Sequence, residues 1–298
     1  FLDRMNEISG IFPTDLREII HFERLEYDQL REIRVRVNQN IRIQYGKREI
    51  TIPQAPVSLE QIYQIIEKAC EYSLYSYEDN MKQGFITIKG GHRIGIGGHV
   101  VTDNTHIKVV SRISFLCIRI AHEVIGCADS IMNFVCKKNR LAHTLIISPP
   151  GCGKTTLLRD MVRQISDGTW LPGKNVCVVD ERSELAATFK GMPQNHVGIR
   201  TDVLDNCPKY EGMLMAVRSL APQVIAVDEL GGMRDVEAVM YCVHCGCIMI
   251  GTVHGLDEQE VCKRPGISEL LNKKIFQRLL VLSGDYENHI RCVDLEGL

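Results

Sequence analysis

The stretch Ser148-Pro149-Pro150-Gly151-Cys152-Gly153-Lys154-Thr155-Thr156 decides the fold of this chain. It follows a short apolar run at 145–147 and precedes a helical stretch at 157–165, an order that predicts a strand, a tight loop and a helix. Gly151 and Gly153 are expected to turn backbone N–H groups inward, where a Cβ would clash. The N-terminus of the following helix adds partial positive charge. The stretch is therefore typical of a loop that binds phosphate groups.

The side chains of this loop indicate a nucleotide bound together with a metal ion. Lys154 can reach the β and γ phosphates, and the hydroxyl group of Thr155 can ligate Mg²⁺. The first position holds Ser148, where this kind of loop usually has glycine. A chance glycine-rich turn is the alternative, and the apolar strand in front of the loop argues against it. We therefore expect residues 148–156 to bind ATP with Mg²⁺.

A second motif, Val224-Ile225-Ala226-Val227-Asp228-Glu229, predicts a buried strand that ends in two acids. Ligands of open parallel α/β sheets bind at this edge of the sheet. Asp228 can hold Mg²⁺ through water, and Glu229 can orient and deprotonate the attacking water. An acidic turn after a strand is common, so this motif gains its meaning from the loop at 148–156. Together the two motifs predict the hydrolysis of ATP.

Two further strand ends carry groups that could serve the same site. The apolar run 176–179 leads into Asp180-Glu181-Arg182-Ser183-Glu184, and Glu181 and Glu184 are the next candidates for the base after Glu229. His254 follows another apolar run and could contact the γ-phosphate or relay its loss. An isolated histidine at a strand end can equally be structural, and both interpretations stay open.

The apolar runs of the second half predict an α/β fold. Runs at 145–147, 176–179, 224–227 and 248–250 alternate with helical stretches, which is typical of a parallel sheet covered on both faces. We expect a RecA-like P-loop ATPase domain over residues 139–298. Residues 1–138 are expected to form a smaller domain of mixed α and β structure.

Shorter signals predict individual elements outside these runs. Alternating apolar residues over 33–45 predict a hairpin. A capping box at 58–61 predicts the start of a helix, and residues 76–79 predict the start of a second, short helix. A closing hairpin is expected around 284–285.

Composition limits the classes of function. The chain has 298 residues, with 35 Lys and Arg against 37 Asp and Glu, which gives a formal net charge of −2. A protein that acts on nucleic acid usually carries a basic excess, so we expect no nucleic-acid partner. No apolar run approaches the roughly 18–20 residues that span a bilayer. A second protein could still hold the chain at a membrane.

The chain has 12 cysteines at irregular spacing. This usage predicts reduced, mostly buried thiols in a cytosolic protein rather than a disulfide framework. Cys242, His244, Cys245 and Cys247 form a tempting metal-like cluster, but a zinc site would want a second pair at similar spacing. We favour a helix end that runs into a buried strand, and a zinc site is the alternative.

The order of these motifs resembles that of the secretion and pilus-type ATPases. That family has a Walker A loop, an acidic box, a Walker B strand and a histidine box, which correspond here to 148–156, 180–184, 224–229 and 252–254. Arg218, upstream of the Walker B strand, also resembles that family. The similarity to its sporulation members extends along nearly the whole chain and includes 32–37, 84–87, 90–93, 148–160 and 221–231. Typical secretion ATPases have glycine where this chain has Asp228.

This resemblance implies a cytosolic hexameric ATPase motor that is recruited peripherally to a membrane-embedded channel between mother cell and forespore. It also implies that each nucleotide lies between neighbouring subunits, so that arginines of one N-terminal domain act on the nucleotide of the next. Arg93 and Arg119 occupy such positions, and Arg218 is a further candidate within the P-loop domain. The alternative for each single arginine is a pairing with a surface acid.

Two other functions stay open on the sequence alone. The first is a P-loop ATPase that acts on nucleic acid, which the near-neutral charge disfavours. The second is a scaffold that binds nucleotide without hydrolysing it. The presence of Lys154, Thr155, Asp228 and Glu229 argues against a scaffold, because a scaffold would not need a residue that activates water.

Overall fold

The structure, a computed structural model, describes residues 2–73, 77, 81–82, 84–103, 106–137, 140–283 and 290–295. The chain divides into two compact units, residues 1–122 and 123–298. The sequence predicts the domain boundary between residues 138 and 139. The structure does not describe these two residues. The second unit begins earlier because helix α5 (Asp129–Val135) buries Ile131 and Met132 in its core.

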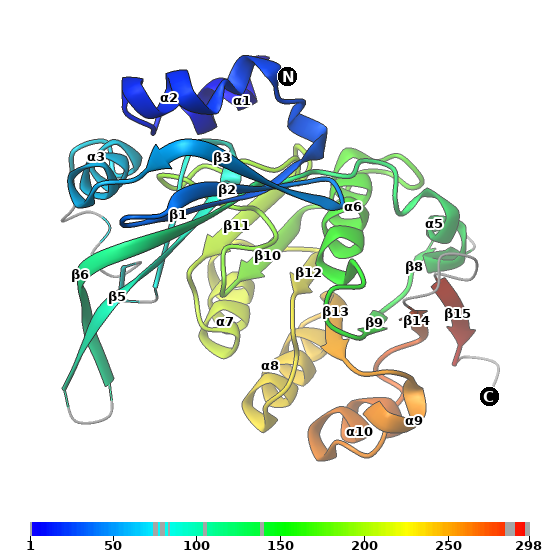
Figure 1. Ribbon diagram of the computed structural model, residues 1–298. Coiled ribbons are helices and arrows are strands. Elements are labelled where there is room, and N and C mark those ends of the chain that lie inside the picture. Colours follow the sequence, from blue (N-terminus) through cyan, green and yellow to red (C-terminus); the bar gives the residue numbers. More distant parts are fainter. Residues whose placement is uncertain are drawn as a thin grey trace. The chain divides into compact units, whose positions relative to one another are not determined.

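The first unit is an antiparallel sheet with three helices packed against it (Figure 1). Its six strands run in the order β3-β2-β1-β6-β5-β4. Ile33 and Val35 of β1 point into one core, which also contains Leu16 from α2 and Ile65 from α3. The elements are α1 (Leu2–Ser9), α2 (Thr14–Ile20), β1 (Leu30–Arg36), β2 (Asn40–Tyr45), β3 (Arg48–Pro56), α3 (Leu59–Ala69), β4 (Phe85–Thr87), β5 (Arg93–Asp103) and β6 (His106–Arg119), with short 3₁₀ turns at Phe22–Arg24, Tyr27–Gln29 and Lys89–Gly91.

Two local predictions for this unit are confirmed. Strands β1 and β2 form the expected antiparallel hairpin. The capping box at the start of α3 is complete, because Ser58 Oγ accepts the N–H of Gln61 at 3.1 Å and Gln61 Oε1 accepts the N–H of Ser58 at 2.8 Å. Ser76 and Asp79, which are expected to start a second helix, and the hairpin turn expected at 284–285 lie outside the described residues.

The second unit is a seven-stranded sheet between two layers of helices (Figure 1). The strand order is β11-β10-β12-β13-β9-β14-β15, and every neighbouring pair is parallel except β14 and β15. Besides α5 the elements are β7 (Cys136–Lys137), β8 (Arg140–Leu141), β9 (Thr144–Ser148), α6 (Lys154–Asp167), β10 (Val176–Asp180), β11 (Thr201–Asp205), α7 (Lys209–Ser219), β12 (Val224–Val227), α8 (Met233–His244), β13 (Ile248–His254), α9 (Glu258–Val261), α10 (Pro265–Asn272), β14 (Arg278–Leu282) and β15 (Ile290–Asp294).

Alternation along the buried strands explains why both faces of this sheet are covered. Val224 and Ala226 of β12 belong to the same core cluster as the apolar side of α6. Ile225 and Val227 belong to the cluster on the other face, which includes residues of α7, α8 and α10. A parallel sheet of this kind must bury both faces, and its strands therefore read as continuous apolar runs.

Strand β11 is the element that the apolar runs did not predict. Its five residues are Thr201, Asp202, Val203, Leu204 and Asp205, and none of them is fully buried. It lies at the edge of the sheet beside β10. An edge strand buries little side-chain surface, so it carries no apolar signature.

The parallel register brings separate stretches of sequence to one edge of the sheet. Ser148 at the end of β9 lies opposite His254 at the end of β13. Val227 lies opposite Gly251 on β13 and opposite Val179 on β10. The residues that follow these positions on each strand are therefore neighbours in space, although they are far apart along the chain.

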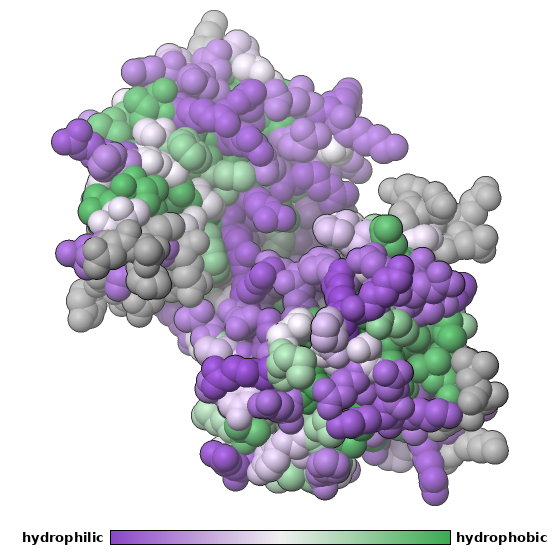
Figure 2. All heavy atoms as spheres, turned by 90° about the horizontal axis from the view of Figure 1, so that it is seen from below, coloured by the Kyte–Doolittle hydropathy of each residue, from purple (hydrophilic) through white to green (hydrophobic). Residues whose placement is uncertain are grey.

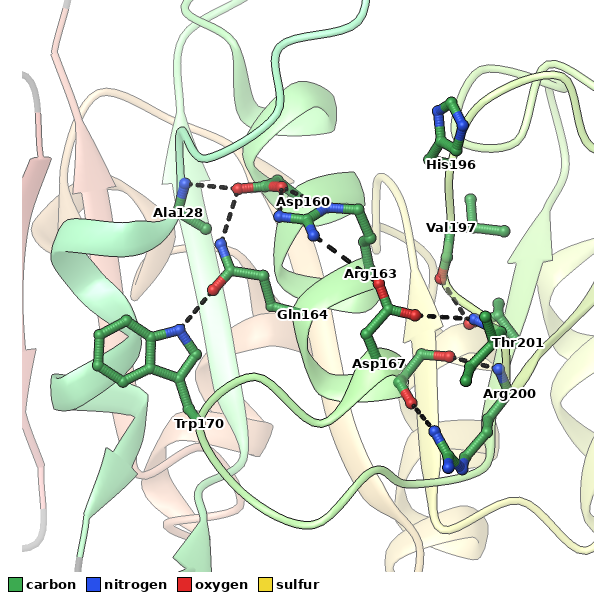
Figure 3. Close-up of polar contacts among 12 residues, drawn as sticks. Ala128, Asp160, Arg163, Gln164, Asp167, Trp170, His196, Val197, Arg200 and Thr201 are labelled. Carbon is green, nitrogen blue, oxygen red and sulfur yellow. Dashed lines mark hydrogen bonds and ion pairs between the residues drawn. The ribbon is translucent and has the colours of Figure 1, made fainter.

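A buried carboxylate anchors helix α6 within the second unit (Figure 3). Asp160 accepts the backbone N–H of Ala128 at 2.9 Å and two guanidinium N–H groups of Arg163 at 2.7 and 2.9 Å. Gln164 donates to the same carboxylate at 2.9 Å and accepts a hydrogen bond from the indole of Trp170. These bonds tie the middle of α6 to the segment before α5 and to the loop that follows α6.

The surface in Figure 2 is mostly hydrophilic, with hydrophobic residues in smaller separate groups. Among the described residues, no helix is both long enough and apolar enough to cross a membrane.

The cysteine cluster of the second unit divides between core and surface. Cys242 and Cys247 are buried, and their thiols donate to the carbonyls of Met213 at 3.8 Å and Pro222 at 3.3 Å. Burial raises the pKa of Cys242 to about 12, so this thiol stays protonated. Cys245 is exposed, so two of these three thiols lie in the core and the third lies at the surface. Within the described ranges, no group of three or more His, Cys, Asp or Glu side chains is placed to hold a metal ion.

The network around Asp160 predicts a large loss of stability when its carboxylate is removed. Asp160→Ala leaves the partly buried Arg163 guanidinium and the Ala128 N–H without their acceptor, and it should lower the free energy of unfolding by roughly 2–4 kcal/mol. Trp170 is the chain's one tryptophan, so its fluorescence during urea unfolding reports on this unit. The exposed Glu237→Ala on α8 is the control and should change stability by less than about 0.5 kcal/mol.

The contribution of Asp160 should also depend on pH. Burial raises the pKa of this carboxyl, but the N–H of Ala128 and the guanidinium of Arg163 lower it more, so the folded value lies below the usual one. Its stabilising effect is therefore present above about pH 4 and is lost as the pH falls through the folded pKa. An equal difference between wild type and Asp160→Ala at pH 7 and pH 2 would contradict this account.

Candidate active site

The loop between β9 and α6 has the backbone that its glycines permit. Gly151 and Gly153 adopt φ angles of 78° and 86°, in the left-handed region that residues with a Cβ avoid. A Cβ at either position would meet no heavy atom within 4 Å. Glycine is therefore required at these two positions because of the backbone angle. The prediction that a Cβ would clash there is wrong. Ser148 is fully buried, and its hydroxyl donates to the carbonyl of Pro149 at 2.8 Å.

The first residue of α6 joins the two predicted motifs. Lys154 Nζ donates to Glu229 Oε1 at 3.1 Å and lies 3.6 Å from Asp228 Oδ1. The lysine is only 7% exposed. A nearly buried ammonium group needs such carboxylate partners, because leaving it unpaired would cost several kcal/mol. The helix N-terminus at this point adds the partial positive charge that favours an anion.

Asp228 is held by two hydroxyl groups, one from the first turn of α6 and one from β13. Thr155 Oγ1 donates to Asp228 Oδ2 at 2.7 Å. The hydroxyl of Thr252 donates to Asp228 Oδ1 and accepts the backbone N–H of Glu229 at 2.9 Å. The juxtaposed carboxylate and hydroxyl oxygens of Asp228 and Thr155 suit Mg²⁺, which prefers hard oxygen ligands and keeps several waters. The residues present therefore fit the expected metal.

Thr252 is the first residue of the histidine box at 252–254, but the sequence alone assigns it no role in the site. It is the residue after Gly251, which lies opposite Val227, so the register places it beside Asp228. It is a fully buried polar side chain in an otherwise apolar strand. That interruption of an apolar run was the available signal, but only the strand pairing shows which residue it faces.

Glu229 is surrounded by three donors. Besides Lys154, His254 Nε2 lies 2.8 Å from Glu229 Oε1 and Arg182 Nη1 lies 2.6 Å from Glu229 Oε2. Burial raises the pKa of Glu229, but Lys154, His254 and Arg182 lower it more, so the net shift is downward. The carboxyl is therefore ionised at neutral pH. Its backbone φ of 58° is unusual for a residue with a side chain and marks a strained position.

The acidic box at 180–184 both shapes a loop and lines a pocket. Asp180 is buried and accepts the backbone N–H groups of Glu184, Leu185 and Ala186 at 2.9–3.0 Å, which shapes the loop. Burial raises the pKa of Asp180 to about 6. Glu181 pairs with Lys209 Nζ at 2.6 Å. Both Glu181 and Glu184 line the same pocket as the Walker B acids.

This pocket lies at the carboxyl ends of β10 and β12. Its lining combines acids from both strand ends with two cations, Arg182 and Lys209, that the sequence reasoning had not assigned to the site. Arg182 stands inside the acidic box, which was a usable signal. Lys209 begins α7, and nothing in its local sequence points to the pocket. The lining residues are Asp180, Glu181, Arg182, Glu184, Lys209, Asp228 and Glu229.

Arg218 does not lie beside the Walker B acids of its own chain. It is exposed and close to the C-terminal end of α7, whereas the first residue of that helix, Lys209, lines the pocket. The rise of an α-helix separates these two positions by about 14 Å. The structure therefore places Arg218 outside the pocket that the Walker B acids line.

Arg93 and Arg119 are neighbours in the first unit. They lie directly opposite each other on β5 and β6, and Arg119 also lies opposite Glu32 on β1. The guanidinium of Arg93 lies 4.0 Å from the ring centre of Phe85. The unit thus presents two adjacent positive charges on one row of its sheet.

Comparison with known families shows the family to which the chain belongs. Residues 2–293 match the family described as sporulation stage III, protein AA. The chain belongs to this family. It is similar to stage III sporulation protein AA of Bacillus subtilis (strain 168), with 37% identity over 282 residues that cover 94% of this chain and 91% of that protein.

Solved structures show the fold to which the family belongs. The ATPase DotB of Yersinia pseudotuberculosis has a TM-score of 0.63 at 14% identity, and the match covers 94% of this chain and 78% of that one. DotB of Legionella pneumophila has a TM-score of 0.61 at 13% identity, with 94% and 79% covered. The pilus retraction motor PilT with bound ADP has a TM-score of 0.58 at 16% identity, with 93% and 80% covered. The predicted P-loop ATPase fold is confirmed.

The position of Thr252 predicts a specific effect on the metal. Thr252→Val keeps the shape of the side chain but removes the hydroxyl that links Asp228 to the backbone of Glu229. Loss of such a supporting hydrogen bond should weaken Mg²⁺-dependent nucleotide binding by about 10- to 100-fold. The measurement is a Mg²⁺ titration of nucleotide binding.

Thr201→Val is the matched control for this experiment. It removes a hydroxyl that donates to the Val197 carbonyl at 2.6 Å on the edge strand, away from the pocket. Binding by this variant should stay at the wild-type level. If both valine variants behave like wild type, Thr252 has no part in holding Asp228 for the metal.

Proposed function

We propose that this member of the sporulation family is a Mg²⁺-dependent ATPase that works as a motor. The observation that carries the proposal is the convergence of Lys154 and Thr155 from one strand–loop–helix unit with Asp228 and Glu229 from another strand. This is the set of groups that phosphoryl transfer to water needs. The likeness to an ATPase and to a pilus motor supports the same assignment.

Each residue has a distinct task in this proposal. The loop 148–156 binds the phosphates of ATP through its N–H groups and Lys154, and Thr155 and Asp228 hold Mg²⁺, which neutralises charge on the phosphates. Glu229 orients the attacking water and accepts its proton. His254, 2.8 Å from Glu229, keeps the carboxylate in place. Glu181 is committed to Lys209 and is a weaker candidate for the base.

The alternatives are less well supported. A nucleotide-binding scaffold would not require an ionised glutamate held beside the phosphate-binding lysine. A motor on nucleic acid would be expected to show a basic excess, and the chain has a formal charge of −2.

We further propose that the protein assembles as a homo-hexamer on the cytoplasmic, mother-cell side of a membrane-embedded sporulation channel. The family assignment and the resemblance to secretion and pilus-type ATPases support this. In such a ring, Arg93 and Arg119 of one subunit would act on the nucleotide of its neighbour. An arginine supplied in this way can contribute about 10³–10⁵ in rate.

Glu229→Gln tests hydrolysis separately from binding. The amide cannot accept the proton of water, so turnover should fall by about 10²–10⁴-fold while ATP and Mg²⁺ still bind. Lys154→Ala is the companion variant and should bind no ATP, because it loses the charged partner of the phosphates. Phosphate release and equilibrium ATP binding are measured on the wild type and on both variants. Unchanged turnover in Glu229→Gln would remove Glu229 as the base.

Mixing two inactive variants tests the shared site. Chains with Arg93→Ala and Arg119→Ala, combined with Glu229→Gln chains, should recover part of the ATPase activity, because some interfaces then contain every required group. Each variant mixed with itself is the control and should stay inactive. Full turnover by a wild-type monomer, with no rescue in the mixture, would leave a self-contained ATPase instead of a ring.

A further inference from the structure

We propose that Arg182 recognises the γ-phosphate of ATP from within the same chain, and that it exchanges its ion pair with Glu229 for an ion pair with this phosphate. Arg182 would thereby make the site favour ATP over ADP. The inference rests on the proposed function and deepens it by naming the residue that distinguishes substrate from product.

The backbone around Arg182 is pinned on both sides. Before it, Asp180 is buried and accepts three backbone N–H groups of the loop. After it, the hydroxyl of Ser183 donates to Asp205 on the edge strand. Since β10 and β12 are adjacent, this pinned loop faces the segment that carries Glu229. Arg182 can therefore exchange Glu229 for a phosphate by rotating its long side chain, while the backbone of the loop stays in place.

The contact between Arg182 and Glu229 is asymmetric. Arg182 Nη1 lies 2.6 Å from Glu229 Oε2, but the arginine side chain is 61% exposed and that of Glu229 is 17% exposed. An ion pair with one well-hydrated partner contributes little net stability, typically about 0–1 kcal/mol. The guanidinium can therefore leave the carboxylate at low cost when a stronger anion is present.

A terminal phosphate is such an anion, and Lys154 indicates where it would bind. Lys154 is expected to hold the β and γ phosphates, and it lies 3.1 Å from the other oxygen of the same Glu229 carboxylate. Lys154 and Arg182 thus flank one carboxylate. A phosphate that engages Lys154 comes within reach of Arg182, whose planar fork of donors suits phosphate oxygens. ADP lacks the terminal group and offers no replacement for Glu229. Lys209 is not an equivalent candidate, because it is paired with Glu181 at 2.6 Å.

The test compares a non-hydrolysable ATP analogue with ADP in binding experiments with Mg²⁺. Arg182→Ala should weaken binding of the analogue by about 10- to 100-fold, the value of a charged hydrogen bond, and should change ADP binding by less than about threefold. Arg182→Lys keeps the charge but not the fork and should fall in between. Thermal unfolding of each variant checks that the fold is kept.

Arg291→Ala is the matched control. Arg291 is 53% exposed and is paired with Glu258 outside the pocket, so its removal changes the charge equally without touching the site. Binding of both nucleotides should remain at the wild-type level.

Each contrary outcome has a distinct meaning. An equal loss of analogue and ADP binding in Arg182→Ala, or no change in either, overturns the recognition of the γ-phosphate. If the wild-type chain binds neither nucleotide, the proposed ATPase function itself fails. The wild-type measurement therefore separates the failure of the function from the failure of the assignment of Arg182.

Discussion

The nearly buried ammonium group of Lys154, lying between Asp228 and Glu229, is the interaction on which the rest of the site depends. A charge that is removed from water must lie close to an opposite charge, because an unpaired buried charge destabilises the folded state by several kcal/mol. Both carboxylates come from the end of β12, so the loop after β9 and the end of β12 have to meet. The strand order β12-β13-β9 places them on one edge with one strand between.

That intervening strand is an active part of the arrangement. Thr252 of β13 holds the segment after β12, because its hydroxyl donates to Asp228 and accepts the backbone N–H of Glu229. Glu229 keeps its left-handed backbone because its N–H and its carboxylate are both held. These hydrogen bonds fix Asp228 and Glu229 relative to each other, and such preorganisation is how a protein lowers the reorganisation cost of phosphoryl transfer. The hydrogen bond from the Ala128 N–H to Asp160 also anchors α6, the helix that begins with Lys154 and Thr155.

In the first unit, local sequence patterns predict the elements that depend on neighbouring residues, but not the contacts that depend on strand register. Its hairpin and capping box follow from neighbouring residues and are present as predicted. The pairing of Arg93 with Arg119 across β5 and β6 depends on register over a long hairpin with several irregularities, and no local pattern contains it. In the second unit, Asp180 lines the pocket and also accepts three backbone N–H groups of the following loop, and no local pattern shows this second task.

The sequence by itself determined the P-loop, the Walker B acids and the α/β class, because each depends on residues that are contiguous or regularly spaced. Only the tertiary structure placed Thr252, Arg182 and Lys209 beside them, and it placed Arg218 outside the pocket that the Walker B acids line. It also added the edge strand β11, which buries too little surface to leave an apolar pattern. The physical reason is strand order. Parallel pairing brings together chain segments dozens of residues apart, and it is chosen by the packing of whole helices and strands rather than by any single motif.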